Sequence, residues 1–108
     1  MKILILANND VGLYKFRKEL IQELIRRGNK VIVSVPDGEL IPDIRNLGVK
    51  VILTDVDRRG INPLTDLKLL IRYFRMEVTL KPDLVITYTI KPNVYGGLVS
   101  RILHIPYA

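Results

Sequence analysis

Four short, mainly apolar runs, each followed by a segment with helical periodicity, limit the folds open to this chain more than any other feature. The runs lie at residues 3–7, 30–35, 49–53 and 83–87. The first, ILILA, does not alternate with polar residues, which is typical of a strand covered on both faces in a parallel sheet. A repeated strand–helix order requires parallel pairing through right-handed crossovers. We therefore predict an α/β fold, an open parallel sheet with strand order 3-2-1-4 and helices on both faces.

The predicted helices have recognisable starts and stops. Helical spacing predicts a first helix from about Leu13 to Arg27, with Gly28 as its stop and a supportive four-residue spacing between Glu23 and Arg27. Prolines in first turns and glycine or proline stops place the other helices at about 42–47, from the Asn62–Pro63 pair toward Pro82, and at about 93–103.

The first and third of these helices carry apolar stripes that we expect to face the core. In the first helix the stripe consists of Leu13, Phe16, Leu20, Ile21, Leu24 and Ile25. In the third helix it consists of Leu64, Leu67, Leu70, Ile71, Phe74 and Val78. Lys68, Arg72 and Arg75 are expected to face away from the core.

Length and composition indicate one globular domain. The chain has 108 residues, 48% of them hydrophobic, which suffices to bury a core. Without cysteine it has neither a disulfide framework nor a thiolate metal site. No signal-like segment is present, and no apolar run approaches the roughly 20 residues that span a bilayer. We expect a cytoplasmic protein.

The charge balance favours anionic partners. Seventeen Lys and Arg against eleven Asp and Glu give a net charge of +6, which suits phosphates or acidic lipid headgroups and also serves solubility. The basic residues are spread over helix faces without interleaved aromatic residues or a recognisable binding motif. We therefore do not expect nucleic acid as a partner.

The last residues suggest that this domain belongs to a longer protein. An apolar segment, IPYA at 105–108, begins where a fifth strand would be expected. A domain usually ends with its sheet edge covered or its last element complete. We expect a fragment whose fifth strand has only begun.

The loop after the first strand is the first place to look for a binding site. In open α/β sheets, ligands bind outside the carboxyl ends of the strands where the strand order reverses. With strand order 3-2-1-4, the loops after the first and fourth strands are neighbours there. The first loop holds Asn8, Asn9, Asp10 and Gly12, all residues that favour turns.

The loop after the fourth strand supplies the second half of this predicted edge. It offers Tyr88, Thr89, Lys91 and Asn93, followed by Gly96 and Gly97 in the next helix. Two explanations of the glycines stay open: close packing of helix on sheet, or a bare helix N-terminus that approaches a phosphate or a sugar. In the second case Lys91 would add a movable charge.

Other basic residues near this edge have two possible roles. Arg58 and Arg59 follow the third strand, and Lys15 and Arg17 lie in the first helix. They are either solvated charges or ligands of phosphate, which the guanidinium group binds with two hydrogen bonds.

Several common sites do not fit this sequence. A dinucleotide-binding turn would need three spaced glycines after the first strand, and only Gly12 is there. We expect no cofactor. Asn9, Asp10, Asp55 and Asp57 could hold magnesium as in a receiver-like regulatory module. However, no fifth strand with a charge-pairing lysine is present, and arginines fill the loop after the third strand.

Four segments together resemble a known enzyme family. They are ANNDVGLYKFRKELI, the NP helix start after DRRG, KPDLVITYTIKPNVYGG, and the closing HIPY. Over its whole length the chain is similar to the amino-terminal domain of family 4 glycosyltransferases of the GT-B fold, in particular bacterial enzymes of capsule, O-antigen and lipid-linked glycan assembly. The resemblance implies one of two Rossmann-like domains, the other being absent from this chain.

The resemblance also implies a division of labour. In that family the amino-terminal domain binds mainly the acceptor, and the other domain holds the nucleotide sugar, which is a substrate rather than a cofactor. It implies transfer with retention at the anomeric carbon, no obligatory metal, and no turnover by residues 1–108 alone.

Carried over by position, the resemblance assigns residues to the interdomain cleft. Asn9, Asp10, Gly12 and Leu13 should face it, with Gly12 able to approach the donor diphosphate. Lys91 and Asn93 occupy the second cleft loop, and Gly96 matches a glycine often found there. Many relatives have a histidine in that loop, where this chain has Ile90 and Lys91.

A lipid diphosphate acceptor would also explain the basic balance, since lysine and arginine bind an anionic inner-membrane surface at about 1 kcal/mol each. We therefore expect a cytoplasmic enzyme that can associate peripherally with the inner face of the membrane. A stand-alone receiver-like or ligand-binding module is the alternative. A GT-B sugar-nucleotide epimerase would need carboxylates and histidines that these loops lack.

Overall fold

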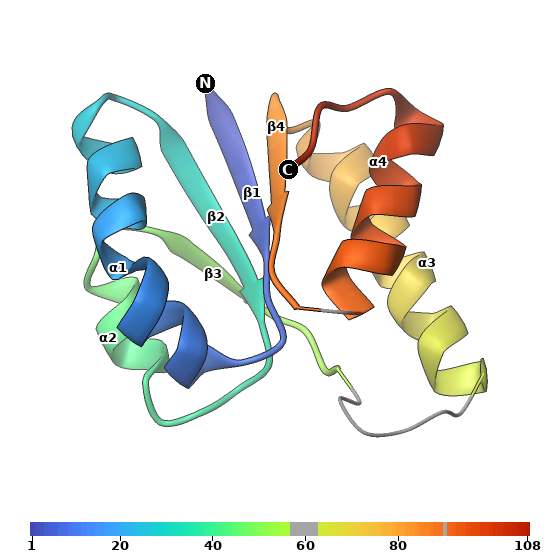
Figure 1. The fold of residues 1–108 in the computed structure, drawn as a ribbon, viewed down its shortest axis with the longest axis horizontal. Helices are drawn as coiled ribbons and strands as arrows, with labels where there is room; N and C mark the ends of the chain where they lie inside the picture. Colours follow the sequence, from blue (N-terminus) through green and yellow to red (C-terminus); the bar gives the residue numbers. More distant parts are fainter. Residues whose placement is uncertain (57–62, 90) are drawn as a thin grey trace.

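The computed structural model, which describes residues 1–56, 63–89 and 91–108, contains one parallel sheet in the order β3-β2-β1-β4 (Figure 1). The strands are β1 (Lys2–Leu6), β2 (Lys30–Val35), β3 (Lys50–Leu53) and β4 (Leu84–Thr87). In the central strand β1, Ile5 is paired with Val33 on one side and with Ile86 on the other. The predicted strand order is confirmed.

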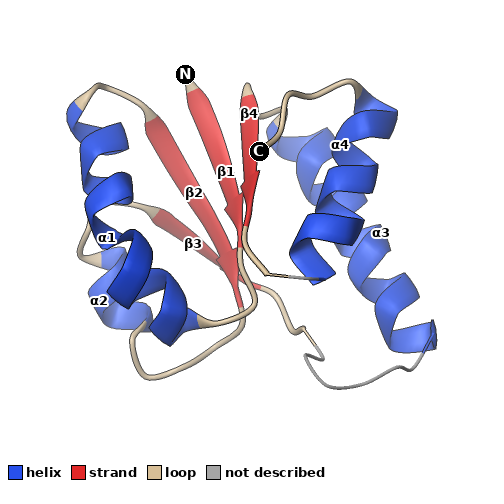
Figure 2. Cartoon of the chain, viewed as in Figure 1, coloured by secondary structure: helices blue, strands red, loops and turns tan. Residues whose placement is uncertain are grey.

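Helices cover both faces of this sheet (Figure 2). α1 (Asp10–Arg26) and α2 (Ile41–Arg45) pack on one face. On the other face lie α3 (Pro63–Leu80), the π-helical turn η1 (Pro92–Gly96) and α4 (Gly97–Leu103). Ile3 and Ile5 belong to the first core and Leu4 and Leu6 to the second, which explains why residues 3–6 of β1 are all apolar.

The helix α1 begins three residues earlier than the apolar periodicity predicted. Asn9 has extended backbone geometry, and its side-chain Oδ1 accepts hydrogen bonds from the backbone N–H groups of Val11 (2.8 Å) and Gly12 (3.2 Å). An asparagine in this position satisfies amides that a helix start otherwise leaves without partners. The cap therefore extends the helix back to Asp10.

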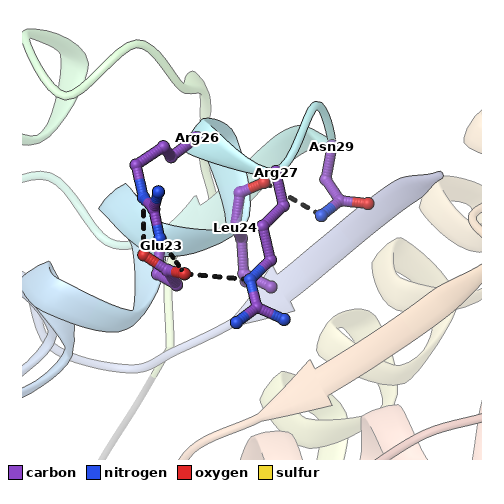
Figure 3. Close-up of polar contacts among 5 residues, drawn as sticks. All are labelled: Glu23, Leu24, Arg26, Arg27 and Asn29. Atoms are coloured by element: carbon purple, nitrogen blue, oxygen red, sulfur yellow. Dashed lines mark hydrogen bonds and ion pairs between the residues drawn. The ribbon is translucent and has the colours of Figure 1, made fainter.

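The carboxyl end of α1 is held by side-chain contacts (Figure 3) and, beyond them, by a glycine turn. The Glu23 carboxylate accepts from Arg26 at 2.5 Å and from Arg27 at 2.9 Å, which confirms the predicted Glu23–Arg27 pair. Asn29 Nδ2 donates to the Leu24 carbonyl at 2.9 Å. Gly28 turns the chain at φ +89°, a region that side chains disfavour.

The predicted core face of α3 is wrong except at Leu70, which is partly buried against the second core. Its residues Leu64, Leu67, Ile71, Phe74 and Val78 are between 42% and 69% exposed. The face that packs on the sheet carries Leu69, Tyr73, Met76 and Glu77 instead. α3 is apolar on two opposite sides. The sequence pattern did not identify the buried side, because that side includes a tyrosine and a glutamate. In α1 likewise, Phe16 is 74% exposed and Leu20 40% exposed, although both were expected in the core.

The last elements pack closely on β1 and β4. A Cβ at Gly96 would meet the side chains of Leu6 and Thr87, so close packing alone accounts for this glycine. The predicted helix at 93–103 opens with the π-helical turn η1. After α4, Tyr107 is bridged to Val85 in parallel sense, at the position predicted for a fifth strand. Within the described ranges, no helix has the length and apolar character needed to cross a bilayer.

A buried carboxyl group joins α3 to α4. Glu77 is 1% exposed, and its Oε1 accepts a 2.6 Å hydrogen bond from Ser100 Oγ. Burial raises the pKa of Glu77 to about 7, although the bond from Ser100 acts in the opposite direction. Burial also raises the pKa of Tyr73, one turn away on the same face. Among the described residues, neither Glu77 Oε2 nor Tyr73 Oη has a hydrogen-bond partner.

We predict that Glu77→Gln makes the protein more stable in neutral and alkaline solution. The folded pKa of about 7 lies above the ordinary value of 4.5, so folding becomes less favourable as pH rises between these values. Glutamine cannot ionise, and the variant should gain on the order of 2 kcal/mol in free energy of unfolding above about pH 7, with little gain near about pH 4. Urea denaturation across this pH range measures it. If the free energy of unfolding changed with pH in the same way in both proteins, the raised pKa of Glu77 would be contradicted.

Two glycine substitutions, one within α1 and one just after its carboxyl end, should change stability in opposite directions. Gly28→Ala places a side chain at positive φ and should lower the free energy of unfolding by about 1 kcal/mol. Gly12→Ala, within the helix and with an added Cβ that would meet no atom within 4 Å apart from its chain neighbours and the adjacent helix backbone, should raise it by up to about 1 kcal/mol. Thermal denaturation of the two variants tests these assigned backbone conformations. Equal shifts of the melting temperature in the two variants would refute them.

Candidate functional site

A pocket of about 230 Å³ lies at the carboxyl ends of β1 and β4. We call it the β1–β4 pocket. It is lined by Ala7, Asn8, Asn9, Gly12, Leu13, Phe16, Arg17, Tyr88 and Thr89. The loops after the first and fourth strands are therefore neighbours on one edge of the sheet, as the strand order predicted.

Strand pairing holds the two loops at the same level. Leu6 is paired with Thr87, and the next amide, that of Tyr88, donates a 2.9 Å hydrogen bond to the Leu6 carbonyl. On the other side, the amide of Ala7 donates to the Ser34 carbonyl at 2.9 Å. The residues at the base of both pocket walls are therefore held in place by backbone hydrogen bonds to the sheet.

Aromatic rings and a guanidinium group shape the pocket. The Arg17 guanidinium carbon lies 4.7 Å from the centre of the Tyr88 ring, within the range of a cation–π interaction. Burial raises the pKa of Tyr88, and the charge of Arg17 partly offsets this rise, so the phenol stays neutral at physiological pH. Phe16 presents a second ring that is 74% exposed. Such a surface can contact an apolar sugar face and an anionic group together.

Asp10 turns away from this pocket. Its Oδ2 accepts a 2.9 Å hydrogen bond from the backbone amide of Leu40, and a Cβ at Gly38 would collide with the same carboxylate. Asp10 instead borders a smaller hollow of about 100 Å³ that also contacts Asp37. Its observed role is to tie the start of α1 to the loop before α2.

Lys91 is bound to α3. Its Nζ donates to Asp66 Oδ1 at 2.7 Å, and Tyr95 Oη donates to Asp66 Oδ2 at 3.0 Å. The hydrogen bond from Lys91 is the main reason why the pKa of Asp66 lies below its ordinary value, and burial opposes it. Lys91 does not line the β1–β4 pocket, and it would have to leave Asp66 to act as a movable charge.

Asn93 and Thr89 stabilise the second loop from within. The side-chain Oδ1 of Asn93 accepts a 2.5 Å hydrogen bond from Thr87 Oγ1. The backbone N–H of Asn93 donates a 3.0 Å hydrogen bond to the Thr89 carbonyl. Thr89 has φ +76°, which strains a residue with a branched side chain. This strained residue lies at the wall of the pocket, where unusual backbone geometry is often found in binding sites.

The structure thus divides the residues predicted for the site. Five of them line the β1–β4 pocket: Asn9, Gly12, Leu13, Tyr88 and Thr89. Lys15 is exposed on α1 outside the pocket, and Gly96 is buried against Leu6 and does not line the pocket. Arg58 and Arg59 lie outside the described residues.

Four pocket residues were missing from the predicted site set: Ala7, Asn8, Phe16 and Arg17. Phe16 had been assigned to the core because it fits the apolar periodicity, and Arg17 had been left as an ambiguous charge. The available signal was their spacing: both lie about one helical turn after Gly12 and Leu13, so they project on the same side of α1. Among the described residues, no group of three His, Asp or Glu side chains could hold a metal ion.

Comparison with known proteins identifies a family and finds proteins that are similar in sequence or in structure. The family model described as glycosyl transferase 4-like matches residues 2–108. The N,N'-diacetylbacillosaminyl-diphospho-undecaprenol alpha-1,3-N-acetylgalactosaminyltransferase of Campylobacter jejuni is 32% identical over 107 residues. This match covers 99% of the chain but only 28% of that relative.

Solved structures share the fold at low identity. MurG of Acinetobacter baumannii superposes with a TM-score of 0.76 at 21% identity, over 98% of this chain and 33% of that one. A glycosyltransferase of Rickettsia africae superposes with a TM-score of 0.78 at 16% identity, over 98% of this chain and 28% of that one. In both cases the chain spans about a third or less of the solved protein.

The Asn9 cap can be tested apart from any binding role. Asn9→Ala removes the acceptor for two helix amides and should lower the free energy of unfolding by about 1 kcal/mol, whereas Asn9→Ser should keep most of it. Urea denaturation measures both variants. If alanine and serine cost the same, Asn9 does not cap α1 in solution.

Proposed function

Because this chain belongs to the glycosyl transferase 4-like family, we propose that it is the acceptor-binding, amino-terminal domain of a two-domain GT-B glycosyltransferase. The observation that carries the proposal is the β1–β4 pocket, which two neighbouring loops form at the carboxyl edge of the sheet. In open α/β folds this edge is where ligands bind. The second domain, outside this chain, would hold the nucleotide-sugar donor.

The proposed acceptor is a lipid-linked saccharide. The name of the Campylobacter relative specifies a diphospho-undecaprenol acceptor, and the net charge of +6 suits such an anionic substrate. In the proposed reaction an acceptor hydroxyl forms a bond to the anomeric carbon as the bond from that carbon to the donor diphosphate breaks. Transfer retains the anomeric configuration and uses neither a metal nor another cofactor.

The pocket residues suggest how each part of the acceptor would be bound. The rings of Phe16 and Tyr88 would contact a sugar face, and the Arg17 guanidinium would bind a phosphate oxygen. The backbone of Gly12 is open to close approach, since an added Cβ would meet nothing within 4 Å. The amides of Val11 and Gly12 already donate to Asn9, so anion binding would depend on Arg17 rather than on these two amides.

The cellular setting follows from such an acceptor. We place the full protein in the cytoplasm, peripherally on the inner face of the plasma membrane, in capsular or other surface polysaccharide assembly. A stand-alone receiver-like module is not favoured, because the family match extends over residues 2–108.

The direct test is a screen of the full-length protein with nucleotide sugars and diphospho-undecaprenol-linked acceptors, with products identified by mass. One added sugar on a lipid-linked acceptor is the expected product. Hydrolysis of the nucleotide sugar without a glycosylated acceptor, or no reaction with any pair, would contradict the proposal.

Two neighbouring cations on α1 provide a matched comparison. Arg17→Ala in the full-length enzyme should raise the KM for the acceptor about tenfold, the loss of roughly one charge-assisted hydrogen bond, and leave the KM for the donor unchanged. Lys18→Ala removes a cation that does not line the pocket, and both KM values should stay as they are. Steady-state kinetics that show equal effects of the two substitutions would remove Arg17 from the site.

A further inference from the structure

One carboxylate of α3 binds the segment that follows the wall of the β1–β4 pocket. Asp66, in the first turn of α3, accepts a 2.7 Å hydrogen bond at Oδ1 from Lys91 Nζ. Its Oδ2 accepts a 3.0 Å hydrogen bond from Tyr95 Oη. Lys91 lies directly before η1 and Tyr95 lies within it, so both oxygens of one side chain hold the same short segment. We call these three residues the Asp66 clamp.

The Asp66 clamp is largely shielded from solvent. The side chains of Lys91 and Asp66 are only 14% and 18% exposed, so their ion pair is screened less than a pair on the open surface. The hydrogen bond to Asp66 is the main reason why the pKa of Tyr95 lies above its ordinary value. The Tyr95 phenol therefore keeps its proton and remains a donor at physiological pH.

Asn93 connects the clamped segment to the pocket. It lies midway between Lys91 and Tyr95, and its contacts are to the end of β4 rather than to α3. Its Oδ1 accepts from Thr87 Oγ1 at 2.5 Å, and its backbone N–H donates to the Thr89 carbonyl at 3.0 Å. Residues two apart in a helical turn point to different sides, which lets residues 91–95 bridge α3 and the pocket wall.

The pocket wall needs such support because Thr89 is strained. Its φ of +76° is unfavourable for a branched side chain, and a backbone of this kind persists only where its surroundings hold it. Thr89 lines the β1–β4 pocket beside Tyr88, whereas Asp66, Lys91 and Tyr95 do not line it. An effect of Asp66 on the pocket therefore has to pass through residues 91–95.

We propose that Asp66 is a positioning residue for acceptor binding: by holding residues 91–95 it keeps Tyr88 and Thr89 in the geometry that the acceptor requires. This inference rests on the proposed acceptor site. Lys91 then stays bound to Asp66 in the acceptor complex. If Lys91 were instead a movable charge that leaves Asp66 for the acceptor, Asp66 would compete with the acceptor, and removal of its charge would have the opposite effect on affinity.

The test compares Asp66→Asn with Glu23→Gln in the full-length protein. Asparagine keeps the size of the side chain, but its Nδ2 is a donor, so it cannot accept from Lys91 and Tyr95 together. The KM for a diphospho-undecaprenol-linked saccharide should rise on the order of tenfold, while the KM for the nucleotide sugar stays unchanged. Glu23 also binds two donors, Arg26 and Arg27, but at the far end of α1, and its substitution should change neither KM.

Steady-state kinetics of these variants decide between the two roles of Lys91. An unchanged or lowered acceptor KM in Asp66→Asn would overturn the proposal, and a lowered value would show that Lys91 is released to bind the acceptor. An equal rise in Glu23→Gln would overturn it too, because the effect would then be one of general stability. Tyr95→Phe removes one hydrogen bond of the clamp without changing a charge, and should raise the acceptor KM by a smaller factor.

Hydrogen–deuterium exchange without substrate tests the clamp independently of turnover. In Asp66→Asn, peptides that contain Asn93 should exchange at least about fivefold faster than in the wild type, and peptides around Glu23 should be unchanged. Glu23→Gln should show the reverse pattern. Wild-type exchange at Asn93 in Asp66→Asn would overturn the proposal. If the wild type transfers sugar while the clamp variants keep its acceptor KM, the positioning role fails and the proposed transferase function stands.

Discussion

Burial of β1 on both faces is the constraint on which the rest of the structure depends. Ile3 and Ile5 complete one core and Leu4 and Leu6 the other, so this strand is stable only in the middle of a sheet with helices on both sides. Hydrogen bonding to β2 and β4 then brings the loop after β1 beside the loop after β4. The position of the β1–β4 pocket is thus a consequence of core formation, and its chemistry depends on the few side chains that the two loops and the first turns of α1 contribute.

The described site is arranged for binding. An aromatic ring with a guanidinium group above it, a capped helix start and a strained threonine form one wall of polar and apolar groups. Polar residues around it, such as Asp10 and Lys91, are occupied in fixing neighbouring loops and helices. This fits a domain that holds an acceptor while a second domain presents the donor, the arrangement proposed for the full-length protein.

The sequence predicted the strands and their order well, because continuous apolar runs and the strand–helix alternation leave few topologies. It predicted side-chain placement less well where a helix is apolar on more than one side. For α3 the wrong face was assigned because Tyr73 and Glu77 interrupt the buried stripe, and polar residues normally mark a solvent face. For Phe16, periodicity indicated the core, yet its side chain is 74% exposed and lines the β1–β4 pocket. Pairings such as Lys91 with Asp66 join residues far apart in the chain and carry no local signal.

The central claim is that the two loops at the ends of β1 and β4 form the acceptor site. Hydrogen–deuterium exchange of the full-length protein, with and without a diphospho-undecaprenol-linked saccharide, tests it most directly. Slower exchange on acceptor binding is expected in peptides from 7–17 and 87–95, which include the pocket loops and the first turns of α1 and η1. Protection confined to other parts of the chain, with these two segments unchanged, would contradict the account.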